Sequence, residues 1–161
     1  MRSALSRVTR ATKALEQAGV AFTVHIYDYD PDAEQIGMQA ADALGEAPAR
    51  VLKTLMALVD GKPVCVIVPS DREVSMKKLA AAFGGKSAQM MKPADAERLS
   101  GYKVGGISPF GQMRRPKAVV EAQALAHDFV YINGGQRGLQ VRLDPRDAAR
   151  VLEAVVAAVV V

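Results

Sequence analysis

Cysteine and histidine are scarce in this sequence. Its 161 residues include one cysteine, Cys65, and two histidines, His25 and His127. A single cysteine cannot form an internal disulfide, which favours a reducing compartment, and we expect the protein in the cytoplasm. These three side chains are also too few for a closed zinc site of the usual Cys/His kind, so we expect no metal and no cofactor.

Long apolar runs are also missing. The C-terminal run 154–161 is apolar but far shorter than the roughly 20 residues that a membrane-spanning helix needs, so we expect no membrane partner. We predict that this run is the packed end of a helix. Residues 1–13 lack acidic side chains, as a transit peptide does, but they contain no apolar core of a secretory signal. An ordinary first helix explains them.

Charge is distributed unevenly along a chain whose net charge is +4. Residues 26–60 are mainly acidic, whereas residues 77–117 hold nine basic and two acidic side chains. The basic ones are Lys77, Lys78, Lys86, Lys92, Arg98, Lys103, Arg114, Arg115 and Lys117. Clustered cations attract phosphate by releasing counterions, so we expect a nucleic-acid backbone along this basic segment. The alternative is a set of solvated charged faces without a partner.

Hydrophobic spacing and turn residues predict one α+β domain over residues 1–161. Half of the residues are hydrophobic, which is enough for one sizeable core. We predict helices over about 4–18, 36–44, 75–83 and 93–100, and from Asp144 onward; the predicted strands cover 22–27, 51–59, 63–69, 87–91, 117–120, 129–133 and 138–143. Strands joined by hairpins, with helices between them, favour a mixed, mostly antiparallel sheet.

The strand predicted over 22–27 alternates in polarity. Phe22, Val24 and Ile26 would face one side, and His25 and Tyr27 the other. The face with His25 and Tyr27 is either a pocket wall or only the polar side of the strand.

Lys53 interrupts the apolar run 51–59, where a strand is expected to be buried on both faces. An ammonium group is costly there unless it meets an anion or a water-filled cleft. Lys53 is therefore a candidate functional residue that projects from an apolar wall. The alternative is that it lies at the frayed start of the strand and reaches bulk water.

Residues 101–111 contain several glycines around Ser108-Pro109. Glycines let a ligand approach the main chain, and backbone N–H groups in such a loop can hold a carboxylate, a phosphate or a developing oxyanion. The simpler alternative is a tight turn without a ligand.

A protein nucleophile is hard to find. Two histidines offer few ways to activate Ser108 or Ser70, so we do not expect a serine-hydrolase triad. Cys65 lies within an apolar run and is expected to be a core thiol.

Four segments, ordered along nearly the whole chain, carry a resemblance to a known family. They are His25-Ile26-Tyr27 with Asp30-Pro31, then 51–55, then Gly101-Tyr102 with 104–112, and finally Tyr131 with 134–139. At these spacings they resemble the YbaK/prolyl-tRNA synthetase-associated editing family, specifically its free-standing Cys-tRNA(Pro) deacylases. The resemblance implies a mixed sheet partly closed like a barrel, flanked by helices, with the acylated 3′ end of tRNA in a central cleft.

The resemblance also implies site residues. The family's strand lysine matches Lys53, and its Gly-x-x-x-Pro loop matches Gly105 through Pro109. We expect Lys53 to pair with adenosine or phosphate oxygens while the amides of Gly105, Gly106 and Ile107 hold the ester carbonyl or its oxyanion. Tyr27 and Ser108 would orient the aminoacyl group. The other residues expected to bind substrate are His25, Ile36, Tyr102, Pro109, Gly134, Gly135 and Arg137.

Two positions depart from the family pattern. Gln136 stands where a basic residue is expected, which weakens the expected phosphate contact. Ile36 stands near where an aromatic pocket residue is usual, which leaves amino-acid selectivity open.

In this family the substrate's own cysteine thiol is thought to attack its ester, and prolyl-tRNA synthetase is a plausible docking partner. Two alternatives remain open at this stage. One is a deacylase for another mischarged tRNA, such as Ala-tRNA(Pro), and the other is a non-catalytic module that binds tRNA or a nucleotide through residues 77–117.

Overall fold

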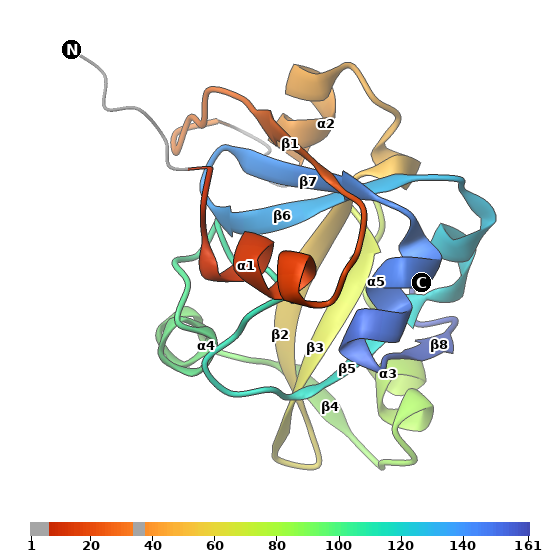
Figure 1. Cartoon of the computed structure of the whole chain (residues 1–161). Coiled ribbons are helices and arrows are strands. Elements are labelled where there is room, and N and C mark those ends of the chain that lie inside the picture. The colour runs from red at the N-terminus through yellow and green to blue at the C-terminus, as the bar shows by residue number, and fades with distance from the viewer. Residues whose placement is uncertain (1–6, 34–37) are drawn as a thin grey trace.

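The computed structural model describes residues 7–33 and 38–161, whose strands form two sheets (Figure 1). One sheet has the order β1 (Thr23–Ile26), β7 (Leu139–Leu143), β6 (Val130–Gln136), and both of its pairs are antiparallel. The other has the order β4 (Ala88–Met90), β2 (Leu52–Val59), β3 (Lys62–Pro69), β5 (Lys117–Glu121), β8 (Val155–Ala157). Its β3–β5 and β5–β8 pairs are parallel, so the predicted mixture of directions is confirmed.

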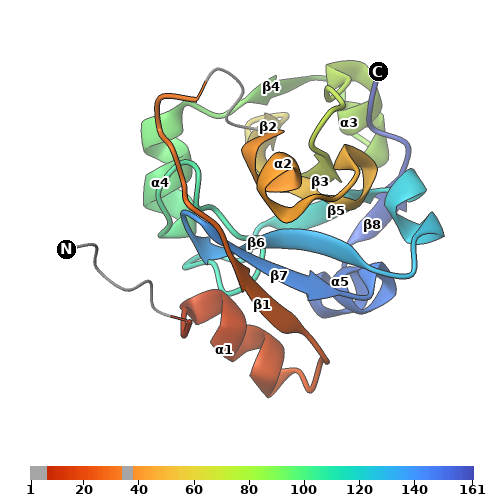
Figure 2. The ribbon, with the colours of Figure 1, turned by 90° about the horizontal axis from the view of Figure 1, so that it is seen from above.

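The helices lie around these sheets (Figures 1 and 2). They are α1 (Arg10–Gln17), α2 (Gln39–Leu44), α3 (Met76–Ala82), α4 (Pro93–Ser100) and α5 (Pro145–Leu152), with short 3-10 turns η2 (Pro48–Arg50) and η3 (Ala122–Ala126). The first helix begins later than predicted, since Arg7 to Thr9 are not helical. Thr9 is its N-cap and forms a reciprocal capping box with Thr12, which sets the start of the helix at Arg10.

The predicted hairpin between β2 and β3 is confirmed. Asp60 and Gly61 both have positive φ, at 50° and 79°, as a two-residue turn of the favoured hand requires. The Asp60 carboxylate also accepts hydrogen bonds from the amides of Lys86 and Ser87, which holds the start of β4 next to the hairpin.

The two sheets do not close into a barrel, which corrects the expectation drawn from the resemblance. Only an isolated bridge, Val51 to Tyr131, joins β2 to β6 in the described part of the chain. Two residues further along β6 the ladder is interrupted by a bulge between Asn133 and Gln136. The Asn133 side chain accepts from the amides of Gly135 and Gln136 there, which holds this bulge in place.

The C-terminal run is not the end of a helix, contrary to the prediction. Helix α5 stops at Leu152, Glu153 adopts a left-handed conformation, and β8 then pairs with β5. Valines favour extended structure because their branched Cβ is restricted in a helix. The fully buried Glu121 carboxylate accepts hydrogen bonds from the amides of Val159 and Val160 at 2.8 and 3.2 Å, which anchors the segment after β8.

Replacing Glu121 by glutamine is expected to lower the free energy of unfolding by about 2 kcal/mol, because a side-chain NH₂ cannot accept from backbone N–H groups that bond to a charged acceptor. Chemical denaturation measures the loss. Glu16→Gln, at an exposed position on α1, is the matched control and should change stability by less than about 0.5 kcal/mol. Equal stability of the two variants would contradict this role for Glu121.

The three-stranded sheet has an apolar inner face and a polar outer face, as the alternation in β1 predicted. Val24, Val141 and Ile132 pack into the main core together with Leu15 of α1. The outer face carries the side chains that alternate with these: Thr23, His25 and Tyr27, Gln140 and Arg142, and Tyr131 and Asn133. Among the described helices none is long and apolar enough to cross a membrane.

Candidate active site

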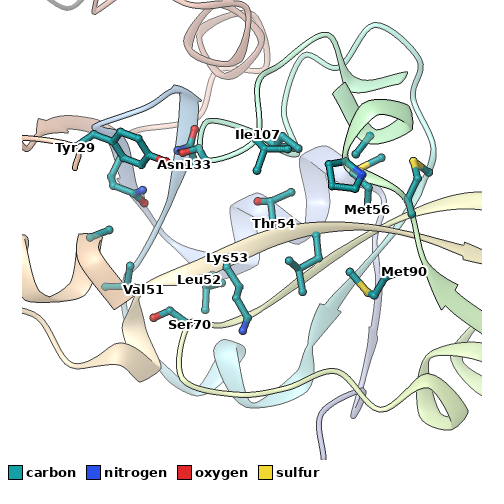
Figure 3. A pocket seen from close by; sticks show the side chains of 18 of the residues that line it. Tyr29, Val51, Leu52, Lys53, Thr54, Met56, Ser70, Met90, Ile107 and Asn133 are labelled. Atoms are coloured by element: carbon teal, nitrogen blue, oxygen red, sulfur yellow. The ribbon is translucent and has the colours of Figure 1, made fainter. Parts of the chain in front are cut away.

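A pocket lies beside the edge of β2 that faces the gap between the sheets (Figure 3). β4 pairs with β2 only at residues 57–59, and the bridge to β6 is at Val51, so residues 53–55 have no strand partner on this side among the described residues. The cavity has a volume of about 290 Å³. Its walls come from β2, from the start of α4 and from the glycine-rich loop 101–111, which we call the glycine loop.

Hydrogen bonds from side chains within it and from the adjacent Gln112 hold the glycine loop. The buried Tyr102 hydroxyl donates to the carbonyl of Phe110 at 2.6 Å, and the Ser108 hydroxyl accepts from the Phe110 amide at 3.2 Å. Gln112 donates to the carbonyl of Ser108 at 2.9 Å. Ser108 is fully buried by these contacts and does not line the pocket. The expected roles of Ser108 and Tyr102 in contacting substrate therefore have no support from their positions, and both shape the loop.

Gly105 and Ile107 are the residues of this loop that line the pocket. No hydrogen bond within the described chain engages their N–H groups, whereas the Gly106 amide already donates to the carbonyl of Lys103 at 2.8 Å. Of the three amides expected to receive the ester carbonyl, two are thus available. Gly105 has φ of 89°, and Gly106 lies so close to the main chain of Arg137 that an added Cβ would be 2.8 Å from its amide nitrogen.

Asn133 connects the glycine loop to β6. Its amide nitrogen donates to the carbonyls of Gly105 at 3.2 Å and Gln136 at 3.4 Å, while its oxygen accepts from Gly135. One side chain therefore bonds to the bulge of β6 and also supports the glycine loop. The sequence reasoning missed Asn133, although its place directly before two glycines was the available signal.

Lys53 lines the same pocket as Gly105 and Ile107. In Figure 3 its ammonium points to the opposite side of β2 from Ile107 and Thr54, toward the side on which Ser70 lies. Partial burial lowers the pKa of Lys53, and the nearby carboxylates of Glu73 and Asp71 oppose this shift. The side chain is not directed at the glycine loop, and Lys53 also borders a second hollow with Ser70, Asp71 and Glu73.

Two polar oxygens on the pocket-lining residues are buried and have no hydrogen-bond partner in the described chain. They are Oγ1 of Thr54 and Oε1 of Gln140. Burial raises the pKa of the neighbouring Tyr27, and a hydrogen bond from the Gln140 side chain opposes the shift. An unsatisfied buried oxygen costs free energy, and such groups in native proteins call for a functional explanation.

Tyr29 is a second residue that the sequence reasoning missed. It lines the pocket, its hydroxyl lies 2.7 Å from the point where a Cβ on Gly105 would be, and the Arg137 guanidinium lies 5.4 Å from its ring centroid. Arg137 also donates to the carbonyl of Val104 at 2.9 Å. The exposed Arg137 thus braces Tyr29 and the glycine loop from outside the pocket.

The other predicted substrate-binding residues do not line this pocket. His25 packs edge-on against Tyr131 with ring centroids 5.2 Å apart, and Pro109 faces a different hollow between α1 and α5. The side chain of Leu139 occupies the position that a Cβ on Gly134 would take, and the ring of Tyr102 lies close to the corresponding position on Gly135. Ile36 lies outside the described residues.

Among the described residues, the site contains no activated protein nucleophile. Cys65 is fully buried, and burial raises its pKa to about 12. No described hydrogen bond joins Ser108 or Ser70 to a histidine, and the described residues include no cluster of three His, Cys, Asp or Glu side chains that could hold a metal ion. The arrangement offers backbone donors, polar oxygens and one ammonium around a small cavity, which suits positioning and charge stabilisation of an already reactive group.

Comparisons with known proteins identify relatives of this chain. A relative from Enterococcus faecalis, EbsC, named as a candidate Cys-tRNA(Pro)/Cys-tRNA(Cys) deacylase, is 30% identical over 141 residues, 85% of this chain and 84% of the relative. The Multifunctional Ser/Thr-tRNA deacylase ProXp-y of Escherichia coli K12 is 26% identical over 149 residues, 89% of this chain and 87% of that protein.

A solved structure described as a candidate trans-editing enzyme for prolyl tRNA synthetase has the same fold, with a TM-score of 0.79 and 21% identity over 94% of this chain and 95% of that one. The sequence profile of the Aminoacyl-tRNA editing domain matches residues 30–151, which include β2, the glycine loop and β6. The chain therefore belongs to the aminoacyl-tRNA editing domain family, as its four ordered segments predicted.

Proposed function

We propose that this protein deacylates mischarged Cys-tRNA(Pro), with the thiol of the substrate as the nucleophile. The observation that carries the proposal is a small pocket with two unengaged loop amides, of Gly105 and Ile107, and no activated nucleophile of its own. An aminoacyl ester is already reactive, so orientation and stabilisation of its developing oxyanion supply most of what the reaction needs.

The reaction balances without a cofactor. The cysteine sulfur attacks the ester carbonyl carbon, a C–S bond forms, the bond to the ribose oxygen breaks, and the thiol proton goes to that oxygen. Water then hydrolyses the resulting internal thioester to free cysteine. The protein's part is to hold the carbonyl oxygen at the Gly105 and Ile107 amides.

Lys53 and the two unpartnered oxygens would hold the rest of the substrate. We assign the ribose or phosphate oxygens to the Lys53 ammonium, on the far side of the β2 edge. The α-ammonium of the aminoacyl group carries three N–H donors, and the buried oxygens of Thr54 and Gln140 are acceptors without a donor. Tyr27 borders this part of the pocket and limits its size.

A second candidate is deacylation of a hydroxyl amino acid such as serine, for which the E. coli relative is named. The same unpartnered oxygens favour it, since they can accept from a substrate hydroxyl. Serine has a hydroxyl where cysteine has a thiol and is otherwise the same. A comparison of Ser- and Cys-tRNA(Pro) therefore distinguishes the fit of the side chain in the pocket from attack by the thiol.

The test is turnover of Cys-, Ser-, Ala- and Pro-tRNA(Pro) by the purified protein. We expect Cys-tRNA(Pro) to be the best substrate and Ser-tRNA(Pro) to be at least about 100-fold slower. Comparable rates for the two would show that the thiol is not the nucleophile, and no turnover of any of the four by folded protein would remove the activity. Adding prolyl-tRNA synthetase to the same assay tests for docking on that enzyme, which would raise the rate.

Replacing Thr54 by valine, which is nearly isosteric, is expected to move activity and stability in opposite directions. Loss of the buried hydroxyl removes an unsatisfied polar group, so the free energy of unfolding should stay the same or rise by about 1 kcal/mol. Loss of its contact with the substrate should lower kcat/KM for Cys-tRNA(Pro) about tenfold. Ser75→Ala, which removes the N-cap of α3 far from the pocket, is the control and should lower stability alone. A fall in stability without a fall in activity for Thr54→Val would contradict the assignment.

A further inference from the structure

The outer face of the three-stranded sheet carries an arginine that the pocket does not use. In the strand register Arg142 lies opposite Thr23 on one side and Tyr131 on the other. In Figure 2, α2 lies beyond β6, and neither α1 nor α2 covers β7 and β1. The side chains of Arg142, His25 and Phe129 are therefore only partly buried, and we call these three residues with Arg50 the outer track.

Phe129 holds two guanidinium groups against one ring. The Cζ atoms of Arg142 and Arg50 lie 3.8 and 4.3 Å from its centroid. Both guanidinium groups therefore contact this one ring. Stacking on an aromatic face fixes a guanidinium and leaves its N–H edge free to bind a planar anion or a phosphate.

The charges of the two arginines are balanced differently. Arg50 pairs with the Asp128 carboxylate at 2.6 Å, whereas Arg142 has no ion pair within 4 Å among the described residues. The acidic residues that follow it, Asp144 and Asp147, pair with Arg146 and Arg150 instead. Partial burial and the charge of Arg142 lower the pKa of His25, so the cation available here at neutral pH is Arg142.

The outer track is continuous with the pocket. Gln140 lies on the same face of β7 as Arg142, two residues away, and lines the pocket together with Tyr27 and Asn133. Two strand residues span about 7 Å, the length of roughly two stacked nucleotides at 3.4 Å each. A chain of nucleotides whose last ribose is acylated inside the pocket would therefore pass Arg142 within its next two phosphates.

We propose that the outer track binds the sugar-phosphate chain of the aminoacylated RNA directly upstream of its terminal nucleotide, with Arg142 contacting a phosphate and Phe129 positioning its guanidinium. This inference rests on the proposed function. The expectation that the basic segment 77–117 also contacts the backbone stays a prediction; that segment is spread over α3, β4, α4 and the loop before β5 (Figure 1).

The test uses an uncharged RNA hairpin with a single-stranded 3′ tail, measured by fluorescence anisotropy over a series of salt concentrations. Arg142→Gln should weaken binding roughly tenfold and reduce the slope of log K against log salt by about 1, the loss of one phosphate contact. Phe129→Leu leaves the charge unchanged and should weaken binding in the same direction. Lys62→Gln, an equal loss of charge at the exposed β2–β3 turn, should leave both quantities unchanged.

Kinetics with two substrates separate this inference from the proposed function. Arg142→Gln should raise KM for a cysteinylated hairpin and leave turnover of cysteinyl-adenosine unchanged, because the smaller substrate has no upstream phosphate. Wild-type affinity and salt slope in Arg142→Gln, or an equal loss in Lys62→Gln, would overturn the outer track. Failure of the wild-type protein to hydrolyse either substrate would instead overturn the proposed function, whatever the hairpin binding shows.

Discussion

Replacing Lys53 by alanine is expected to lower kcat/KM for Cys-tRNA(Pro) by on the order of 100-fold, the effect of removing one charged donor from a preorganised site. The fold should survive the change. Burial lowers the pKa of Lys53, which means that the folded state disfavours its charged form, so truncation removes a charge that the fold does not need.

The pH profile provides a second measurement on the same residue. With its pKa below that of an ordinary lysine, the Lys53 ammonium loses its proton earlier as pH rises. Activity that depends on this charge should therefore fall on the alkaline side sooner than titration of an exposed lysine predicts, and Lys53→Arg should shift the fall to higher pH. The matched control is Lys62→Ala, at an exposed position on the hairpin. Near-normal activity of Lys53→Ala would place the centre of the site elsewhere.

Replacing Gly105 by alanine is expected to reduce kcat/KM by about 100-fold as well, because a displacement of about 1 Å at a reacting centre can have an effect of that size. The residue has φ of 89°, and its new Cβ would lie 2.7 Å from the Tyr29 hydroxyl and 3.1 Å from its ring. The loop amide or Tyr29 must then move, and both line the pocket.

Gly84→Ala separates backbone strain from displacement in the site. Gly84 has φ of 68° and no atom within 4 Å of a new Cβ, so this variant carries similar strain far from the pocket. It should lose about 1 kcal/mol of stability and keep its activity. Tyr29→Phe combined with Gly105→Ala removes the closest atom and should recover part of the rate. If Gly84→Ala and Gly105→Ala lose activity equally, the effect comes from general destabilisation and not from the site.

Much of the site could be anticipated because it depends on local chemistry. The unusual place of Lys53 in an apolar run and the glycines around Ser108-Pro109 pointed to two walls of the pocket, and Gly105, Ile107, Lys53 and Tyr27 do line it. The same reasoning could not say which polar groups of the loop are already engaged. That is decided by contacts within the folded loop. There the Gly106 amide donates to the Lys103 carbonyl, and the Ser108 hydroxyl accepts from the Phe110 amide.

Other features were missed because they depend on segments far apart in the sequence. Asn133 is important through its bonds to Gly105, 28 positions away, and Arg142 through stacking on Phe129 from another strand. The final strand was predicted as helix, since the carboxylate that anchors its neighbours belongs to Glu121, 38 residues before Val159. Contacts between residues so far apart in the sequence arise only when the chain packs, and the residues of one segment alone do not predict them.

By itself, the sequence determined the elements whose geometry is local: the Asp60-Gly61 turn, the two faces of β1, the Asp144 cap of α5 and the conformational freedom at Gly105. Steric limits and hydrogen bonds between near neighbours are enough for these. Only the tertiary structure decided that the sheets stay open between β2 and β6, that the Lys53 ammonium lies on the other side of β2 from the glycine loop, and that Arg142 has no ion pair within the described chain. The reason is that burial and long-range contacts set the position of a charge, and they arise only when distant segments pack together.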